Sequence, residues 1–505
     1  MNLLRFSALL LAVCLSAPGT HADSCSLQPQ VQKIVGDVSE DRIRAIIARL
    51  VAFGTRNTLS SQDDPERGIG AARKWIFDQL QSYSPRLQVR YDHWRVKKQG
   101  QRIVKDIDLY NVIAVLPGKT DPEAQIIVSG HYDSLNLGTP VGRGAGAGNA
   151  GTANPDGGPA PAAVGERPIQ ANWEKNIDLP APGACDDGSG TAAVMELARV
   201  MSRYEFGKTL VFIAFAGEEQ GLVGSTLEAA KVKKENQIIE AVLNNDIIGT
   251  DVSGDGRTGN SAVAVYSDET LDSPAQQLAR YVHTIGQLYL PQMSVDPLYM
   301  QDRLGRGGDH TPFQQEGYPA VRFSTPNEIL ANQHHATDTL ENMSVPYTAC
   351  VARVNAAAAA SLALAPRTPE IMTQPRRNGN GDSANSSASD GAASAAAPST
   401  TPGAPAANRR LPMISRGSGY DAVLRWRPAG SDANLKGYAI VMRATTSPFW
   451  EREIYVGKVT EFTFKGLSID ETRFGVKAIG NDGTESLVAA YAYPARQKVE
   501  YQTEQ

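Results

Sequence analysis

The pattern of apolar and polar positions divides residues 23–365 into alternating helical and strand-like segments. Helical spacing, with apolar residues every three or four positions, runs through residues 41–53, 68–83 and 191–203. Short apolar runs, bounded by Gly, Pro or Asp, predict buried strands at residues 111–116, 125–128, 209–215, 241–243 and 320–323. This alternation predicts an α/β domain with a mostly parallel central sheet flanked by helices.

A different pattern begins near residue 412. Short alternating segments, separated by turn residues, recur from residue 420 to residue 494 and predict a small all-β sandwich over residues 412–505. Trp426, the segment 436–438 and the turn at 478–486 resemble a fibronectin type III domain, although Phe474 stands where that family often has Tyr.

Two segments are too rich in small and polar residues to bury a core. An insert at about residues 138–182, dominated by Gly, Ala and Pro in its first part, predicts a long surface loop. It is either a lid or specificity loop over the site described below, or a tolerated insertion. Residues 366–411, rich in Ser, Ala, Pro and Gly, predict a flexible linker.

Length, composition and the N-terminus narrow the class of protein. A chain of 505 residues is too long to fold around one hydrophobic core, so we expect two or more domains. Its net charge of −5 gives no electrostatic field suited to binding nucleic acid or an anionic membrane. Residues 1–22 contain Arg5, an apolar run and a small-residue exit at Ala22, which predicts a signal peptide. No later apolar stretch reaches the roughly 20 residues of a membrane span. We therefore expect an exported, soluble protein, periplasmic or extracellular.

Three cysteines follow the predicted cleavage site: Cys25, Cys185 and Cys350. One hypothesis pairs Cys25 with Cys350 in a disulfide and leaves Cys185 reduced, and the other leaves all three as free thiols. The sequence keeps both open.

Clusters of His, Asp and Glu follow or flank the predicted strands, where open α/β sheets place their ligands. They are His131-Tyr132-Asp133, Asp186-Asp187, Glu218-Glu219, Asp246, and His334-His335 ahead of Asp338. Each cluster alone has an ordinary explanation, such as a helix cap or a solvated turn. Together they favour a metal site.

The residue types fit the chemistry of a zinc hydrolase. A neutral His131 can bind zinc through one ring nitrogen while Asp133 accepts the proton on the other. A carboxylate at the bend of Asp186 can bridge two metal ions. Of the adjacent acids Glu218 and Glu219, one can bind metal while the other serves as general base.

Taken in order, these motifs resemble the secreted bacterial two-zinc aminopeptidase family, which is related to leucyl aminopeptidases, glutamate carboxypeptidases and the peptidase-like domain of the transferrin receptor. The resemblance covers nearly all of residues 40–365, with further matches at 54–56 and 308–313. It implies two zinc ions per chain. The implied ligands are His131, Asp186 and Asp246 for one ion, and Asp186, Glu219 and His334 for the other.

The resemblance also implies roles that spacing alone does not give. Glu218 becomes the general base, with Asp133 as a second catalytic residue. His334 is preferred to His335 because it lies four residues before Asp338, and the bond between Asp186 and Asp187 is expected to be cis.

The implied activity is hydrolysis of the N-terminal bond of peptide or protein substrates. Three alternatives stay open. A carboxypeptidase or dipeptidase would use the same metal site, and a glutaminyl cyclase would use one zinc. A protein that acts chiefly by binding would use the sandwich to dock on a surface or polymer.

Overall fold

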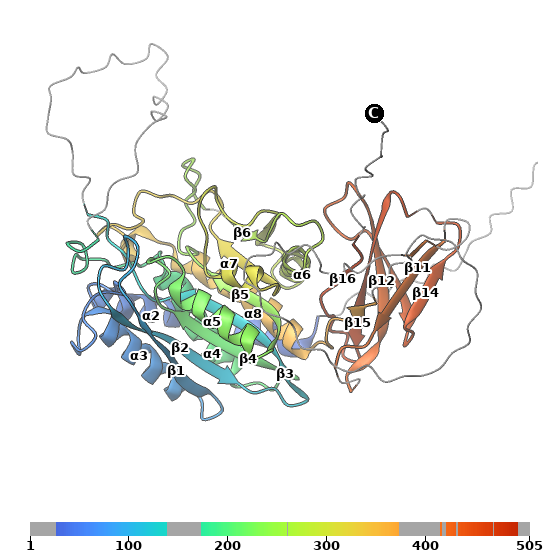
Figure 1. Ribbon diagram of the computed structural model, residues 1–505, viewed down its shortest axis with the longest axis horizontal. Helices are drawn as coiled ribbons and strands as arrows, with labels where there is room; N and C mark the ends of the chain where they lie inside the picture. The colour runs from blue at the N-terminus through green and yellow to red at the C-terminus, as the bar shows by residue number, and fades with distance from the viewer. Residues whose placement is uncertain are drawn as a thin grey trace, which may run out of the picture.

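The computed structural model describes residues 27–138, 173–259, 261–372, 415–416, 421–430, 433–467 and 469–492. The predicted signal peptide, most of the insert, most of the linker and Cys25 of the predicted disulfide lie outside the described residues. Within them, an α/β region lies beside a smaller all-β region (Figure 1).

A mixed sheet forms the centre of the α/β region. Its eight described strands are, in spatial order, β1 (Gln88–Val96), β2 (Ile107–Leu116), β4 (Lys208–Phe215), β3 (Asp121–His131), β5 (Ile238–Asn245), β8 (Ala320–Ser324), β6 (Ala262–Tyr266) and β7 (Ser294–Leu298). Strands β4, β3, β5 and β8 run parallel to one another, as do β6 and β7, whereas β1 and β2 are antiparallel. The predicted mostly parallel sheet is confirmed, and each of the five predicted strands lies within an observed one.

Helices cover both faces of this sheet. One face packs against α3 (Gly68–Tyr83), α4 (Gly188–Met201), α6 (Pro274–Tyr289) and α8 (Val345–Leu364). Beyond them, α1 (Pro29–Gly36) packs against α8, and α2 (Glu40–Ala52) packs against α4 and α8. The other face packs against α5 (Val223–Lys234) and α7 (His310–Gln315), and a short 3-10 helix, η1 (Leu340–Asn342), precedes α8.

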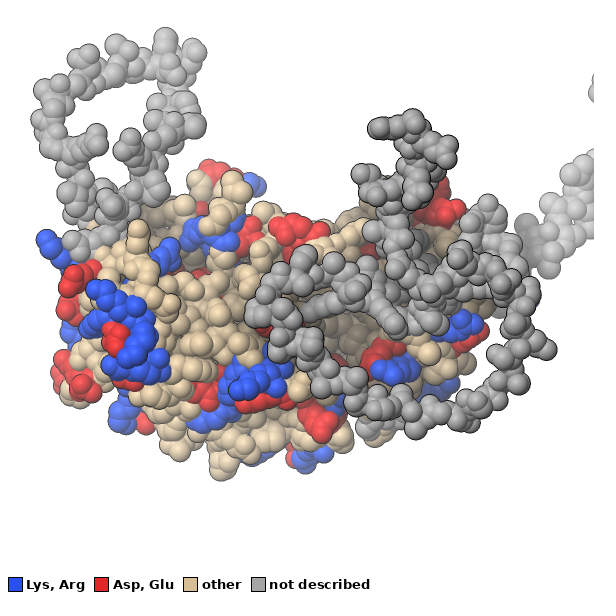
Figure 2. Space-filling view, viewed as in Figure 1, with Lys and Arg blue, Asp and Glu red and all other residues tan. Residues whose placement is uncertain are grey.

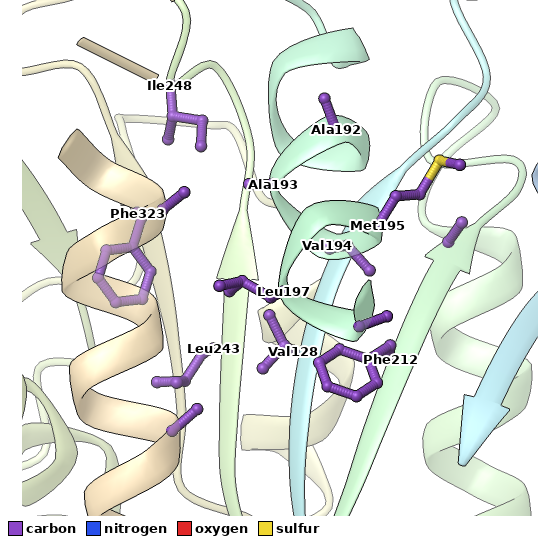
Figure 3. Close-up of a cluster of buried hydrophobic side chains, with 14 of the residues drawn as sticks. Val128, Ala192, Ala193, Val194, Met195, Leu197, Phe212, Leu243, Ile248 and Phe323 are labelled. Carbon is purple, nitrogen blue, oxygen red and sulfur yellow. The ribbon is translucent and has the colours of Figure 1, made fainter. Parts of the chain in front are cut away.

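Helix α4 is buried around almost its whole circumference. Its residues Val194 and Leu197 pack over Val128, Phe212 and Leu243 of the central strands (Figure 3). A helix that is apolar on all sides belongs in the interior. The start of α4 lies close to the carboxyl ends of β3 and β5, because its N-cap Asp187 accepts the N–H groups of His131 and Ile247.

The expectation that no later segment reaches the length of a membrane span needs a correction at α8. Val345–Leu364 is 20 residues long and apolar enough to cross a membrane by length and composition, because it is rich in Ala and Val. In the described structure, 83% of its apolar window is buried. That burial is what the core helix of a folded domain shows.

The all-β region consists of two antiparallel sheets, so the predicted sandwich is confirmed. One sheet contains β10 (Ser415–Arg416), β11 (Ala422–Arg427) and β14 (Glu461–Phe464), with β9 (Glu370–Ile371) paired to β11. The other contains β13 (Arg452–Gly457), β12 (Leu435–Ala444), β15 (Thr472–Gly480) and β16 (Ala489–Ala490). The likeness to fibronectin type III stays a prediction.

Strand β9 lies inside the segment that the sequence assigned to a flexible linker, so that assignment is wrong for its first residues. Ile371 packs against the core of the sandwich, and this apolar contact explains why the chain is ordered there. The end of the insert is likewise anchored, because Ala181 forms a β-bridge with Thr55.

The sandwich contacts α6 and the residues just before it through buried polar groups. Arg443 of β12 lies 2.8 Å from Asp272, which also pairs with Arg280 at 3.1 Å. The indole of Trp450 donates to Gln277. Removal of one partner of a buried ion pair strongly destabilises a protein, so these contacts hold the sandwich against α6.

On the outer surface, positive and negative side chains are interspersed over the face shown in Figure 2.

Candidate metal centre

The sequence-predicted site residues meet at one edge of the sheet. His131 is the last residue of β3, Glu218 and Glu219 follow β4, and Asp246 follows β5. Because β3 lies between β4 and β5 and runs parallel to both, these side chains reach the same edge. Asp186 joins them from the turn before α4.

Two groups of side chains could each hold a metal ion. Within each group, the potential ligand atoms lie within 4.8 Å of one another. The groups are His131, Glu218 and Asp246, and Asp186, Glu219 and His334. Five of these six are the ligands that the resemblance implies, and the sixth, Glu218, is the implied base.

Asp186 lies between the two histidines. Its Oδ1 is 3.2 Å from Nε2 of His131, and its Oδ2 is 3.0 Å from Nε2 of His334. Nε2 of His131 is also 3.7 Å from Asp246, and Nε2 of His334 is 3.2 Å from Glu219. One carboxylate therefore connects both groups.

The donor set fits zinc, which binds imidazole nitrogen and carboxylate oxygen. Nε2 of His131 and Oε1 of Glu219 are buried and have no hydrogen-bond partner among the described residues. Buried polar atoms are normally satisfied, and exceptions call for an ion, a water or a functional reason. The residues present are thus suited to metal at the positions where these atoms converge.

Asp133 is fully buried behind the cluster and touches three of its members. Its Oδ1 lies 3.4 Å from Nδ1 of His131, and the same ring nitrogen lies 3.1 Å from the backbone carbonyl of Asp133. Its carboxylate also accepts the backbone N–H groups of Glu218 at 3.3 Å and Glu219 at 3.2 Å. Asp133 therefore orients the histidine and both acids at once.

Hydrogen bonds also fix the turn that carries Asp186. Asp187 caps α4 through the N–H of Gly190 at 2.8 Å, and its other oxygen accepts the N–H of His131 at 3.1 Å. Asp338 accepts the N–H groups of Cys185 and Asp186. The peptide bond between Asp186 and Asp187 is cis, as the resemblance implied.

Burial shifts the ionisation of several acids in this region. Burial, together with the charges of Glu219, Asp246 and Asp309, raises the pKa of Glu218 well above its usual range, although His131 opposes the shift. Burial also raises the pKa of Asp309 and that of Asp338 to about 7 each. Acids with such raised pKa values are concentrated at functional sites.

Arg322 belongs to none of the sequence motifs, and the structure places it beside the cluster. Arg322 lies in β8, is fully buried, and donates through Nε to Asp246 at 2.9 Å and through a terminal nitrogen to Asp302 at 3.0 Å. The signal was present, because an arginine inside a buried apolar strand needs a charged partner.

Arg56, part of the motif at residues 54–56, holds two backbone segments of the site together. Its buried guanidinium donates to the carbonyl groups of Tyr132 at 2.7 Å and Gly183 at 2.8 Å. These carbonyls flank the strand end at His131 and the turn before Asp186. Burial lowers the pKa of Arg56 to about 10.

A pocket of about 360 Å³ opens beside the cluster. Five of the candidate site residues line it: Asp186, Glu218, Glu219, Asp246 and His334. His335 belongs to neither group of candidate ligands.

Comparison with known proteins gives the family. The profile of Peptidase family M28 matches residues 111–359. A probable zinc metalloprotease of Pyricularia oryzae is 35% identical over 492 residues, which cover 90% of this chain and 83% of that protein. A second probable zinc metalloprotease, from Leptosphaeria maculans, is 30% identical and covers 92% of this chain and 97% of its own length.

Among solved structures, the LapA aminopeptidase of Legionella pneumophila is similar, with a TM-score of 0.46 and 17% identity over 66% of this chain and 74% of that one. Both metalloprotease relatives named above are fungal, so the bacterial part of the resemblance stays a prediction. The extent of the match to the metalloproteases is what decides the assignment: the chain belongs to peptidase family M28 and is a metallopeptidase.

Proposed function

We propose that this metallopeptidase is an exported aminopeptidase that binds two zinc ions and hydrolyses the N-terminal bond of peptides. The observation that carries the proposal is the place of Asp186. Its two oxygens face two different histidines, His131 at 3.2 Å and His334 at 3.0 Å. A carboxylate in this position is suited to bridge a pair of ions.

The proposed ligands follow from that bridge. They are His131, Asp186 and Asp246 for one zinc, and Asp186, Glu219 and His334 for the other. Bound zinc supplies a Lewis acid for the scissile carbonyl and lowers the pKa of the attacking water.

Glu218 is the proposed general base. Its carboxylate belongs to the same group of atoms as His131 and Asp246, it lines the pocket, and its backbone is tied to Asp133. From this position it takes a proton from the attacking water and later gives it to the leaving amine.

Selection of the N-terminus has an electrostatic basis in the same pocket. Glu218 lines it and, unlike Asp186 and Glu219, is not a proposed zinc ligand, so its carboxylate can attract the positive α-amino group of a peptide. A peptide whose amino group is acetylated lacks that charge and should be a poor substrate.

The test uses one peptide in free and N-acetylated forms, with wild type and Glu218→Gln. We expect cleavage of the free form only, and a loss of kcat of roughly 10³-fold in Glu218→Gln with zinc content unchanged. Glu205→Gln is the matched control, because Glu205 is exposed on the surface and pairs with Lys119. Equal cleavage of the acetylated peptide would rule out an aminopeptidase, and dependence on a free C-terminus would favour a carboxypeptidase.

The export part of the proposal has a separate test. It rests on residues 1–22, whose Arg5, apolar run and Ala22 fit a cleaved signal peptide. Mass spectrometry of the secreted protein should find Asp23 at its N-terminus. Recovery of the intact Met1 from the same fraction would contradict it.

A further inference from the structure

Three arginines line the pocket together with the candidate ligands. They are Arg102, Arg303 and Arg306. Arg102 lies between β1 and β2, and the other two lie between β7 and α7. Separate segments of the chain thus bring guanidinium groups to one cavity of about 360 Å³.

The carboxylates near these arginines neutralise them only in part. Glu328 pairs with Arg303 and Arg306, and Asp302 pairs with Arg303 and with Arg322. Arg322 does not line the pocket, and it pairs with Asp246 as well as with Asp302. Arg303 and Arg306 therefore share Glu328. The contact of Arg306 with Glu328 is 3.3 Å long and its side chain is 35% exposed, so its charge is only partly neutralised.

Arg102 adds a second positive charge. It donates to the backbone carbonyl of Glu219 at 3.1 Å, and its guanidinium lies 5.2 Å from the ring centre of Trp173. Among the described residues, no carboxylate forms an ion pair with it. The carbonyl and the ring hold Arg102 at the pocket without cancelling its charge.

The rest of the lining offers little to an apolar substrate. Leu222 is the one apolar side chain among the described residues that line the pocket, apart from the glycines 221, 305 and 307. A pocket that selects a large aliphatic residue is lined mainly by apolar groups. Apart from the candidate site residues, Gln333 and Leu222, this lining combines small residues with positive charge.

We propose that this pocket holds a carboxylate of the substrate, bound by Arg102 and Arg306, so that the enzyme prefers peptides that carry an acidic group next to the cleaved bond. The inference rests on the proposed aminopeptidase function and names its substrate class. Guanidinium groups bind carboxylates through paired, charge-assisted hydrogen bonds, which gives both affinity and orientation. The carboxylate is either the side chain of Asp or Glu, or the free C-terminus of a short peptide.

Kinetics on matched substrates separate these two sources. Glutamyl and glutaminyl α-anilides have the same shape and differ by one charge, and Leu-Leu and Leu-Leu-amide differ only at the C-terminus. We expect wild type to prefer one charged partner by roughly tenfold or more in kcat/KM, since a site that bonds a charged group rejects the analogue that lacks it. The pair that shows the preference identifies the source.

The variants Arg306→Gln and Arg102→Gln should each lower that preference by roughly tenfold. Arg425→Gln is the matched control, because Arg425 lies in the sandwich and pairs with Glu461 at the surface, so its preference should equal that of wild type. A wild-type ratio near one for both substrate pairs, or a ratio unchanged in both pocket variants, would overturn the inference.

A binding measurement keeps the inference apart from the proposed function. Calorimetry on the zinc-loaded protein compares L-glutamate with L-glutamine and Leu-Leu with Leu-Leu-amide, and needs no turnover. If no peptide is cleaved but one charged ligand binds more tightly, and this advantage falls in Arg306→Gln, the aminopeptidase proposal fails and the carboxylate pocket stands. Equal binding within both ligand pairs would remove the pocket inference, whatever the enzyme cleaves.

Discussion

His131 and His334 face the same carboxylate from two different kinds of structure. His131 ends β3, its side chain is 1% exposed, and its backbone N–H donates to Asp187. His334 lies in the loop between β8 and α8, its side chain is 21% exposed, and its φ is +59°. One histidine is fixed by the sheet and the other is presented by a loop.

The carboxylates of the two groups differ in the same way. Asp246 accepts a hydrogen bond from Arg322, which is itself fully buried and paired with Asp302. Glu219 has a buried oxygen without a hydrogen-bond partner among the described residues. Asp246 is therefore held by a buried arginine, which Glu219 lacks among the described residues, and we expect the loop side to depend more on the metal for its order.

Asp186 belongs to both sides, so its removal should have the largest effect. In Asp186→Ala, both proposed zinc sites lose a ligand, and we expect activity to fall by roughly 10⁴-fold or more together with loss of bound zinc. Asp255→Ala, which removes a partly exposed acid paired with Arg257, is the control. Near-normal activity in Asp186→Ala would exclude a shared ligand.

Arg322 supports a candidate ligand on the sheet side and Gln333 supports one on the loop side, so the stability cost of removing each can be compared. Arg322→Met leaves the buried Asp246 without its arginine, whereas Asp302 keeps Arg303. The uncompensated charge should cost about 3–5 kcal/mol of unfolding free energy. Gln333→Ala removes a 2.9 Å hydrogen bond to Asp186 from the loop side and should cost about 1 kcal/mol. Urea unfolding of the zinc-free proteins measures both, and equal losses would remove the asymmetry.

The two histidines should also contribute differently to the unfolding free energy of the zinc-free protein. His131→Ala opens a hole in a buried polar cluster and should lower the unfolding free energy by about 2 kcal/mol. His334→Ala lies at the rim and should lower it by about 0.5 kcal/mol. Thermal unfolding in the presence of a chelator measures the pair. A larger loss in His334→Ala would show that the loop is the more strongly packed side.

Asp133→Asn should weaken zinc binding without removing a proposed ligand. The amide keeps the shape of the side chain but weakens its contacts to His131 and to the backbone of Glu218 and Glu219. Groups that orient a ligand typically contribute about 10–100-fold to metal affinity. Zinc titration with a competing chelator measures the change, and an affinity equal to that of wild type would make Asp133 a purely structural residue.

The sequence contained enough to predict the sheet and the strand-end residues. Short apolar runs such as 209–215 are buried on both faces of the sheet, and such strands can be recognised in the sequence as continuous apolar segments. His131 and Asp246 follow such runs directly, so their meeting at one edge could be expected. Local pattern thus predicted the places of His131 and Asp246, whereas the choice of His334 depended on the family resemblance.

The features that could not be predicted depend on contacts between segments far apart in the sequence. Arg322 meets Asp246 from 76 positions away, and Arg102 meets the backbone of Glu219 from 117 positions away. Strand β9 is only two residues long and forms because Ile371 packs on the sandwich. No local periodicity encodes such pairings, since they arise only after the sheet and the sandwich are assembled.

The central claim is that two zinc ions act together at this site, and a stepwise zinc titration tests it most directly. Zinc is added to the metal-free protein while bound zinc per chain and hydrolysis of an aminoacyl-anilide are measured in the same sample. The account predicts binding of two equivalents, with full activity reached only as the second one binds. Full activity at one zinc per chain, with no second ion bound, would contradict it.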